Sequence, residues 1–259
     1  MRVPNPLRIV VAIGLALGVS GGGRAGDSPS EATIAGSQIT LETRQVSFQG
    51  TVIDRSDEPP RLVVVTAAHG LFPLGEGTPI AVRPVSGGVT LRGAVESAVP
   101  NPGYKPVRSR DSRSAQRFQG AIGSDNSVLT VRLKLGGDDE ERRTFRALRT
   151  VPVTAQPVPA RSQVGVLTVH VVDRNGVEHV VKGGNSLNPK WLAWGARYRP
   201  RPGDSGAGVF LVADSPESSA GPRAVLIGNV VASDDSGGIA ALFSIAEFPA
   251  LTVSALRAR

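Results

Sequence analysis

Apolar residues along this chain gather in many short runs rather than at helical spacing. Such runs occupy residues 63–67, 128–133, 164–172 and 224–231. Turn-forming residues stand between the runs, and the whole chain holds 31 glycines and 20 prolines. Short apolar runs rich in branched residues and bounded by glycine or proline are typical of strands. The pattern therefore predicts an all-β protein.

A proline-spaced segment divides this pattern into two halves. Residues 150–159 read Thr-Val-Pro-Val-Thr-Ala-Gln-Pro-Val-Pro, a composition that suits an extended connector. We therefore expect one unit over 26–150 and a second over 151–259. Two polar stretches are predicted to be solvated: an inserted basic loop over 105–124 and a turn at the charged run 138–143. For the basic loop, an anionic-partner site and a self-cleavage site are the functional alternatives, and for the charged run a metal site is the alternative.

The first 25 residues have the organisation of an export signal peptide. Arg2 and Arg8 precede an apolar run over 9–19, and small residues lead to Ala25. The run is shorter than the roughly 20 apolar residues that span a bilayer, although an uncleaved anchor is the alternative. We expect an exported protein, secreted or held in the periplasm or cell envelope, with no membrane span in the mature chain.

Length, charge and cysteine content narrow the classes of function. The 259 residues are 40% hydrophobic, enough for one large core or two smaller ones. The formal net charge of +7 includes three arginines within the first 25 residues, which contain no acid, so the mature chain would carry +4. This excess is weak evidence for a nucleic-acid partner, and we expect none. The chain has no cysteine, so its fold must be stable without disulfides.

Two separated motifs carry candidate chemistry. Gly203-Asp204-Ser205-Gly206 sets a serine between glycines, where a tight turn can present its hydroxyl. Far upstream, Thr66-Ala67-Ala68-His69 follows an apolar run, so a histidine stands at the end of a predicted strand. A nucleophilic serine needs an imidazole that takes its proton and a buried carboxylate that orients the imidazole. Asp125, at the start of the alternating segment 125–133, is the candidate carboxylate, with Asp111 as the alternative.

These motifs, in the order His, Asp, Ser, resemble those of the trypsin/chymotrypsin-like serine proteases over roughly residues 34 to 250. Weaker similarities are Gln45-Val46-Ser47-Phe48, which looks like the family's first barrel strand, and residues 100–104, which look like the turn before its catalytic Asp. The resemblance implies two six-stranded antiparallel β-barrels with a short C-terminal helix over 248–257. Two departures from the family are Ala207-Gly208 in place of Gly-Pro, and Gly70 in place of a cysteine.

The resemblance also assigns catalytic roles. Ser205 would attack the scissile carbonyl and form an acyl-enzyme, while His69 would act first as general base and then as general acid. Asp125 would orient His69, and the backbone N–H groups of Gly203 and Ser205 would form the oxyanion hole. Such a serine endopeptidase needs no metal and no organic cofactor, and its partner is a peptide or protein substrate.

By the same resemblance, the substrate pocket would have Arg199 at its base and walls from Val231, Ser233 and Gly238. A positive base would favour an acidic side chain before the cut. Substrate main chain would add as an extended strand beside residues 231–233.

Two further features leave alternatives. In many family members a freshly cut terminus pairs with the residue that is Asp204 here; Ile34-Ala35-Gly36-Ser37 is a faint match, but the sequence also permits an enzyme that needs no cut. The histidines 170 and 179 flank an Asn-Gly turn signal, and a two-residue loop would place both on one face with Glu178 opposite; we expect a hairpin rather than a metal site.

The alternative function is a secreted protease-like binding protein without turnover, because Ala207-Gly208 and the loop before Asp125 could distort the cleft. An α/β-hydrolase is excluded, since its Gly-x-Ser-x-Gly elbow would need glycine at position 207.

Overall fold

The computed structural model of the protein describes residues 31–71, 74–105, 122–154, 166–184, 190–213, 223–234 and 236–248. The strands are β1 Gln38–Glu42, β2 Ser47–Asp57, β3 Pro60–Thr66, β4 Pro79–Pro84, β5 Leu91–Pro100, β6 Ser127–Leu133, β7 Leu167–Val172, β8 Glu178–Gly184, β9 Trp191–Gly195, β10 Gly208–Ala213, β11 Arg223–Asp234 and β12 Gly237–Leu242. The helical elements are α1 Glu31–Ser37, η1 Ala68–Leu71, α3 Asp139–Ala147 and η2 Ile245–Glu247. Strands dominate, which confirms the all-β prediction.

The first six strands close into an antiparallel barrel in the order β1-β2-β3-β6-β5-β4. Branched residues fill it, among them Ile39, Val64 and Leu129, which are fully buried. Strands β3 and β6 pair with Thr66 opposite Ser127. This register brings the C-terminal end of β3, which leads to residue 69, beside the N-terminal end of β6, which residue 125 precedes.

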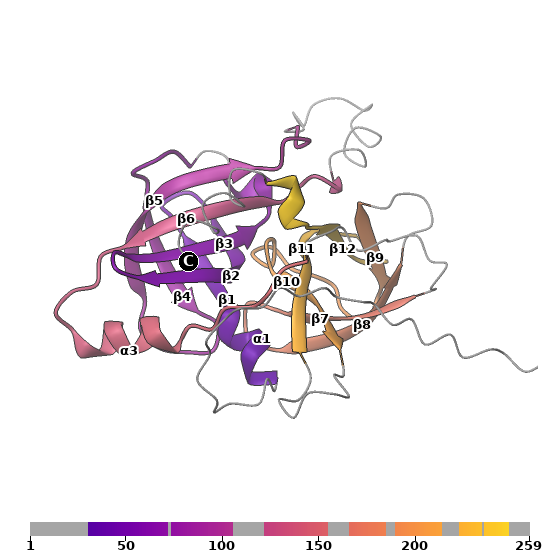
Figure 1. Ribbon diagram of the computed structural model, residues 1–259. Coiled ribbons are helices and arrows are strands. Elements are labelled where there is room, and N and C mark those ends of the chain that lie inside the picture. The colour runs from indigo at the N-terminus through magenta and orange to yellow at the C-terminus, as the bar shows by residue number, and fades with distance from the viewer. Residues whose placement is uncertain are drawn as a thin grey trace, which may run out of the picture.

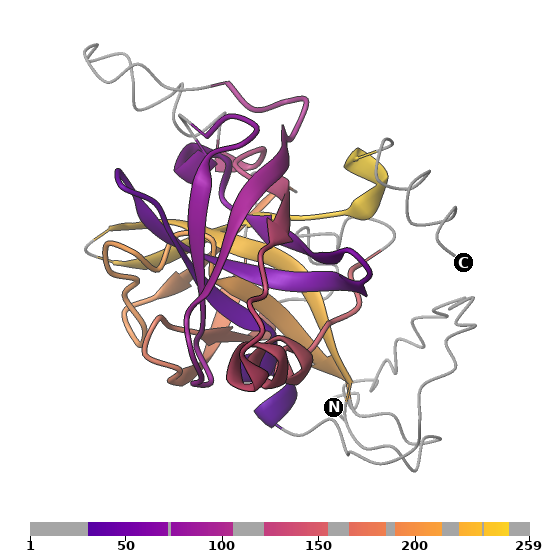
Figure 2. The same ribbon diagram turned by 90° about the vertical axis from the view of Figure 1, so that its left-hand side faces the viewer.

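The last six strands form a second closed antiparallel barrel in the order β10-β11-β12-β9-β8-β7. Its interior is packed by residues such as Val169, Leu192, Val209 and Ile227. The two barrels lie side by side in Figure 1, the first in indigo to pink and the second in salmon to yellow. The view of Figure 2 looks onto the first barrel. The prediction of two six-stranded antiparallel barrels is confirmed.

A shared apolar cluster and polar contacts join the barrels. Val65 and Val128 of the first barrel pack in one buried cluster with Phe210 and Leu226 of the second. The Gln38 side-chain oxygen on β1 accepts the backbone N–H of Gly208 on β10 at 2.9 Å. The segment between the barrels lies along both, because the Val151 N–H donates to Val52 at 3.2 Å and the Leu226 N–H donates to Pro152 at 2.9 Å. The two units are thus held in contact along a continuous surface.

The charged run at 138–143 forms a helix rather than the predicted turn. The Asp138 carboxylate caps the start of α3 by accepting the Glu140 N–H at 2.8 Å. At its other end, the Arg55 guanidinium donates to the carbonyls of Phe145, Arg146 and Leu148 at 3.1, 2.8 and 3.0 Å. Arg55 comes from β2, so the last carbonyls of the helix receive hydrogen bonds from a residue about 90 positions away in the sequence.

In the β7–β8 hairpin, the hydrogen bond between Asp173 and Val177 encloses three residues, not the two of the expected loop. Val172 pairs with Glu178, and the Asp173 N–H donates to Val177 at 3.0 Å, with Gly176 at a φ of +81°. This register puts His170 and Glu178 on one face, where they contact each other, and turns His179 to the other face. The expectation that both histidines share a face is therefore wrong.

Several expected segments lie outside the described residues. They are the signal peptide over 1–25, most of the basic loop and all but the first residue of the helix over 248–257. In the part of the chain that the structure describes, no helix is long and apolar enough to cross a membrane.

Candidate active site

His69 lies in the single helical turn η1 that follows β3. The residues before it are small and buried: Ala67 is 0% exposed and Ala68 1%. The Gly70 N–H closes the turn onto the Ala67 carbonyl at 3.2 Å. The turn directs the His69 side chain out of the barrel, and 39% of that side chain is exposed.

Asp125 holds His69 at two points. Its Oδ2 lies 2.7 Å from His69 Nδ1, and its Oδ1 accepts the His69 backbone N–H at 2.9 Å. Because an ionised carboxylate only accepts hydrogen bonds, the imidazole proton belongs on Nδ1, which leaves Nε2 free to take a proton. Asp125 is itself 7% exposed, and its carbonyl accepts the Asn229 side chain at 3.2 Å. The alternative carboxylate, Asp111, lies outside the described residues.

Opposing effects act on the pKa of His69. Burial lowers it, but the hydrogen bond to Asp125 and the negative charge of Asp125 raise it by more, so the pKa ends above its ordinary value of 6.5. Nearby Tyr104, in the turn expected to precede the aspartate, is also affected. Burial, with the charge of Asp125, raises the pKa of Tyr104 to about 12, which keeps its phenol neutral.

Ser205 lies on a tight turn between β9 and β10. Gly203 and Gly206 adopt φ values of +97° and +89°, in the left-handed region that favours glycine. The Ala207 N–H closes the turn onto the Asp204 carbonyl at 3.0 Å. Ser205 is half-buried. Within the described residues, neither the Gly203 nor the Ser205 amide donates a hydrogen bond, so both are available to a ligand.

This turn is docked on the first barrel, next to the strand that leads to His69. The Gln49 N–H of β2 donates to the Ser205 carbonyl at 2.7 Å, and the Thr66 hydroxyl donates to the Gln49 carbonyl at 2.6 Å. A Cβ on Gly206 would lie only 1.9 Å from the Gln49 carbonyl oxygen, so this position requires glycine. Among the described residues no hydrogen bond joins Ser205 to His69. Such bonds are often long in ligand-free sites and tighten when substrate binds.

The substituted pair after the motif keeps close packing behind the turn. Ala207 is fully buried, and a Cβ on Gly208 would lie 2.4 Å from the Thr51 hydroxyl oxygen and 2.5 Å from the Phe210 ring. Both positions after the serine turn are therefore closely packed against their neighbours. Gly70, the other departure, lies against Phe48, whose ring fills the space beside it.

The predicted pocket residues fall on β11, β12 and the loop before Ser205. Ser233 and Gly238 are directly opposite each other across the β11–β12 ladder, and Val231 lies at a bulge in that ladder. Arg199 is exposed. A Cβ on Gly238 would lie 2.3 Å from the Trp194 ring, so Trp194 packs against this wall.

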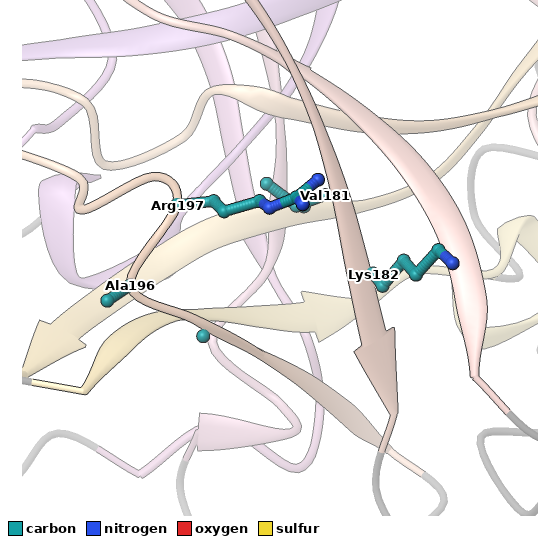
Figure 3. Close-up of a pocket in the computed structure, with 5 residues that line it drawn as sticks. Val181, Lys182, Ala196 and Arg197 are labelled. Carbon is teal, nitrogen blue, oxygen red and sulfur yellow. The ribbon is translucent and has the colours of Figure 1, made fainter.

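A separate hollow of about 350 Å³ opens on the second barrel (Figure 3). It is lined by Val181, Lys182, Gly195, Ala196 and Arg197, and by none of the three candidate catalytic residues. Within the described residues, no group of three His, Cys, Asp or Glu side chains is placed to hold a metal ion.

Sequence reasoning missed the residues that support the serine turn. Gln49 and Gln38 bind the turn and the strand after it through contacts across the barrels, and Tyr198 and Arg174 contact the turn from within the second barrel. The two barrel-crossing contacts leave no local pattern. Tyr198 precedes Ser205 by only seven positions, and the hairpin signal around Arg174 was visible, but nothing in the sequence linked them.

Comparison with known proteins defines the fold. A Glu endopeptidase structure aligns with a TM-score of 0.51 and 11% identity, covering 91% of this chain and 99% of that chain. The chain has the trypsin/chymotrypsin-like serine protease fold. A scabies mite inactivated protease paralogue also matches, with a TM-score of 0.49 and 11% identity over 90% of this chain and 96% of that chain. A thermostable serine protease, AL20, from an extremophilic microorganism has a TM-score of 0.47 and 13% identity, over 85% of this chain and 99% of that chain.

No family model matches the sequence, and no curated protein matches it. At these identities, the structural likeness describes the protease-like fold, and the chemistry must be argued from the site itself.

Proposed function

We propose that this protein is an exported serine endopeptidase in which Ser205 is the nucleophile, His69 the general base and Asp125 the orienting carboxylate. The observation that carries the proposal is the two-point hold of Asp125 on His69, at 2.7 and 2.9 Å. A carboxylate that binds both the ring and the backbone of a histidine fixes its tautomer and its direction. Asp125 precedes β6 and His69 follows β3, so strand register supports the same pairing.

The reaction follows from these positions. The Ser205 Oγ bonds to the scissile carbonyl carbon while its proton passes to His69 Nε2, and Asp125 stabilises the imidazolium. The imidazolium then gives its proton to the leaving amine as the C–N bond breaks, which leaves an acyl-enzyme. Water attacks the acyl-enzyme, loses a proton to His69, and the product acid leaves as Ser205 regains its proton.

The oxyanion of each tetrahedral intermediate would be bound by the backbone N–H groups of Gly203 and Ser205. Both amides lack a hydrogen-bond partner among the described residues, and the positive φ of Gly203 allows the tight turn that carries them. One such donor is typically worth roughly 3 kcal/mol to the transition state.

For the substrate, we propose peptide main chain along β11 and a pocket formed by Arg199, Val231, Ser233 and Gly238. The pairing of Ser233 with Gly238 supports a common wall, and the positive charge of Arg199, an exposed residue, supports a preference for an acidic side chain before the cut. A set of peptides that differ only at this position should show faster cleavage after Glu or Asp than after Leu or Lys. If the variant Arg199→Met cleaves all of these peptides at equal rates, Arg199 sets the preference.

The proposed mature enzyme begins after residue 25 and acts outside the cell or in the cell envelope. Its first part, 26–150, would supply His69 and Asp125. Its second part, 151–259, would supply Ser205. Mass spectrometry of the protein recovered from culture medium and envelope fractions tests the export step. A protein found only in the cytoplasm with residues 1–25 intact would contradict it.

A protease-like binding protein without turnover is the second candidate, because no hydrogen bond joins Ser205 to His69 among the described residues. Peptide hydrolysis by the purified protein distinguishes the endopeptidase from the binding protein. The purified protein should cleave a mixture of peptides, and Ser205→Ala should abolish cleavage while the matched control Ser47→Ala, at an exposed position on β2, leaves it unchanged. Peptide binding by a folded protein that cleaves none of the mixture would favour the binding protein.

A further inference from the structure

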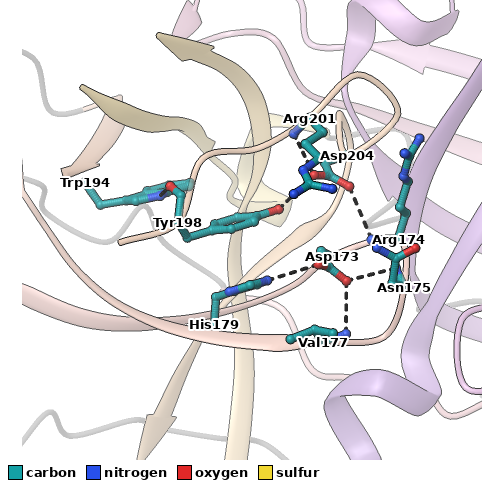
Figure 4. Close-up of polar contacts among 9 residues, drawn as sticks. All are labelled: Asp173, Arg174, Asn175, Val177, His179, Trp194, Tyr198, Arg201 and Asp204. Atoms are coloured by element: carbon teal, nitrogen blue, oxygen red, sulfur yellow. Dashed lines mark hydrogen bonds and ion pairs between the residues drawn. The ribbon is translucent and has the colours of Figure 1, made fainter. Parts of the chain in front are cut away.

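The side chain of Asp204, the residue before Ser205, is bound on both oxygens from within the second barrel. It is 2% exposed. Its Oδ2 accepts the Arg201 N–H at 2.7 Å and the Tyr198 hydroxyl at 3.1 Å, and its Oδ1 accepts the Arg174 N–H at 3.3 Å (Figure 4). A buried carboxylate without donors is costly, so these three groups determine where Asp204 lies.

Arg174 also binds the peptide unit that carries one oxyanion donor. Its Nη1 donates to the Pro202 carbonyl at 3.0 Å, and the same atom would lie 3.2 Å from a Cβ on Gly203. The Pro202 carbonyl and the Gly203 N–H belong to one peptide plane and point in opposite directions, because the peptide bond is trans. A guanidinium that holds the carbonyl on one side therefore directs the Gly203 N–H to the other side.

The hairpin that carries Arg174 is itself fixed. The Asp173 Oδ1 accepts the N–H groups of Asn175 and Val177 at 2.9 and 3.0 Å, which sets the loop between β7 and β8. Its Oδ2 lies 3.1 Å from His179 Nε2. One aspartate thus organises both the loop with Arg174 and the ring of His179, as Figure 4 shows.

Tyr198 is held at its ring and at its backbone. The His179 ring stacks on it with centroids 4.0 Å apart and an angle of 14°, and the Trp194 indole N–H donates to its carbonyl at 2.9 Å. Burial, with the charge of Asp204 and the hydrogen bond to it, raises the pKa of Tyr198, so its phenol remains a neutral donor. Tyr198 therefore presents its hydroxyl to Asp204 in a fixed direction.

We propose that Arg174 and Tyr198 are positioning residues that hold the Gly203-Asp204-Ser205 turn with its amides directed at the oxyanion site, without a newly cut amino terminus. This inference rests on the proposed function. The amide of Gly203 is set through the Pro202 carbonyl, and the amide of Ser205 is set through the side chain of the residue before it. The hairpin and Tyr198 occupy the carboxylate that a cut terminus would otherwise bind.

The position of Ile34 is consistent with this assignment. Ile34 is the residue whose new amino group the family resemblance would bring to Asp204. It lies instead within α1, 3% exposed, in the apolar cluster that joins the barrels, and its carbonyl accepts the Ser37 hydroxyl at 2.8 Å. Ile34 thus has a structural role in the uncut chain.

The test compares Arg174→Met and Tyr198→Phe with Arg83→Met, a control that removes an exposed ion pair with Glu42 on the first barrel. Tyr198→Phe keeps the ring and its stacking and removes only the hydroxyl. We expect each of the two test variants to lower kcat about tenfold while KM stays within about twofold, because oxyanion donors act in the transition state. The control should match the unchanged protein, and Arg174→Lys should recover part of the loss.

Inhibitor binding separates positioning from general damage. A peptide boronate forms a tetrahedral adduct that needs the oxyanion donors, so its affinity should fall in step with kcat, whereas the affinity of a cleaved product peptide should not change. Thermal unfolding checks that each variant is folded. If a variant unfolds at the assay temperature, both affinities are measured below its unfolding temperature. There too, the boronate affinity should fall relative to the unchanged protein while the product affinity does not.

The outcomes are distinct from those that test the proposed function. Reaction of Ser205 with a fluorophosphonate in chains that mass spectrometry shows to be uncut between Thr33 and Ile34 supports the inference. Reaction only after a cut there, or full kcat in both variants, would overturn it and leave the proposed function intact. If Ser205 of the folded protein does not react in cut or uncut chains, the proposed function fails and this inference falls with it.

Discussion

The two barrels supply their parts of the candidate site in different ways. In the first barrel, His69 and Asp125 stand at the ends of paired strands, and the register that places Thr66 opposite Ser127 brings them together. In the second barrel, Ser205 stands on a turn whose position depends on Gln49, Gly206 and the side chain of Asp204. Strand pairing within one barrel thus brings one half of the site together, and docking between the barrels places the other.

A substitution in the first-barrel half of the site should remove activity while the protein stays folded. Asp125→Asn removes the acceptor that keeps the imidazole proton on Nδ1, so we expect kcat/KM to fall about ten-thousandfold. Thermal unfolding should change much less than activity. A fall of less than tenfold in a folded variant would show that Asp125 does not orient His69.

A substitution in the second-barrel half should remove activity by displacing the serine turn from the first barrel. Gly206→Val puts side-chain atoms where the Gln49 carbonyl lies, and the left-handed φ adds strain. We expect turnover to fall at least a thousandfold and the melting temperature to drop. The control Gly137→Val, on a surface with no atom within 4 Å of a Cβ, should leave turnover unchanged. Near-normal turnover by Gly206→Val would mean that the turn need not dock on β2.

The pH dependence of kcat/KM should report the first-barrel pair alone. The base form of His69 is neutral and Asp125 raises its pKa, so activity should rise with pH through a midpoint above 6.5, the ordinary histidine value. The acid limb should move to lower pH in any residual activity of Asp125→Asn. A wild-type midpoint below the ordinary value would contradict the strong coupling between these residues.

A barrel-crossing contact away from the chemistry should have a moderate effect. Gln38→Leu leaves the Gly208 N–H without its acceptor at 2.9 Å, in a buried position. An unsatisfied buried donor costs about 1–3 kcal/mol of stability. Denaturant unfolding should show that loss, with a fall in kcat that is smaller than in Gly206→Val. Unchanged stability would show that the contact does not help to hold the barrels together.

The smallest effect on turnover is expected at the cap of α3. Arg55→Met removes donors to three carbonyls at the end of this helix, which lies at the lower edge of the first barrel in Figure 1. Stability should fall by about 1–2 kcal/mol with kcat/KM unchanged. A parallel fall in turnover would connect α3 to the site.

The sequence allowed prediction where the determinant was local. Alternation in residues 125–133 and an apolar run that ends before residue 69 predicted two strands, and the motif at 203–206 predicted a glycine-flanked turn. The fold class followed from many such runs.

Prediction failed where distant residues decide the outcome. The run at 138–143 was interpreted as a turn, yet Arg55 and the Asp138 cap complete a helix there. The hydrogen bond between Asp173 and Val177 encloses three residues rather than two, and the Asp173 side chain accepts two backbone N–H groups within this loop. The change in register placed the two histidines on opposite faces. The same hairpin supplies Arg174 to the serine turn, a contact that no spacing in the sequence signals.

The central claim is that Ser205 is an activated nucleophile whose reactivity depends on His69 and Asp125. The most direct measurement is the rate at which a fluorophosphonate labels the purified protein, with the labelled peptide mapped by mass spectrometry. The account predicts labelling on Ser205 alone, abolished in His69→Ala, slowed strongly in Asp125→Asn and unchanged in Ser47→Ala. Labelling of another serine, or equal labelling of Ser205 without His69, would contradict it.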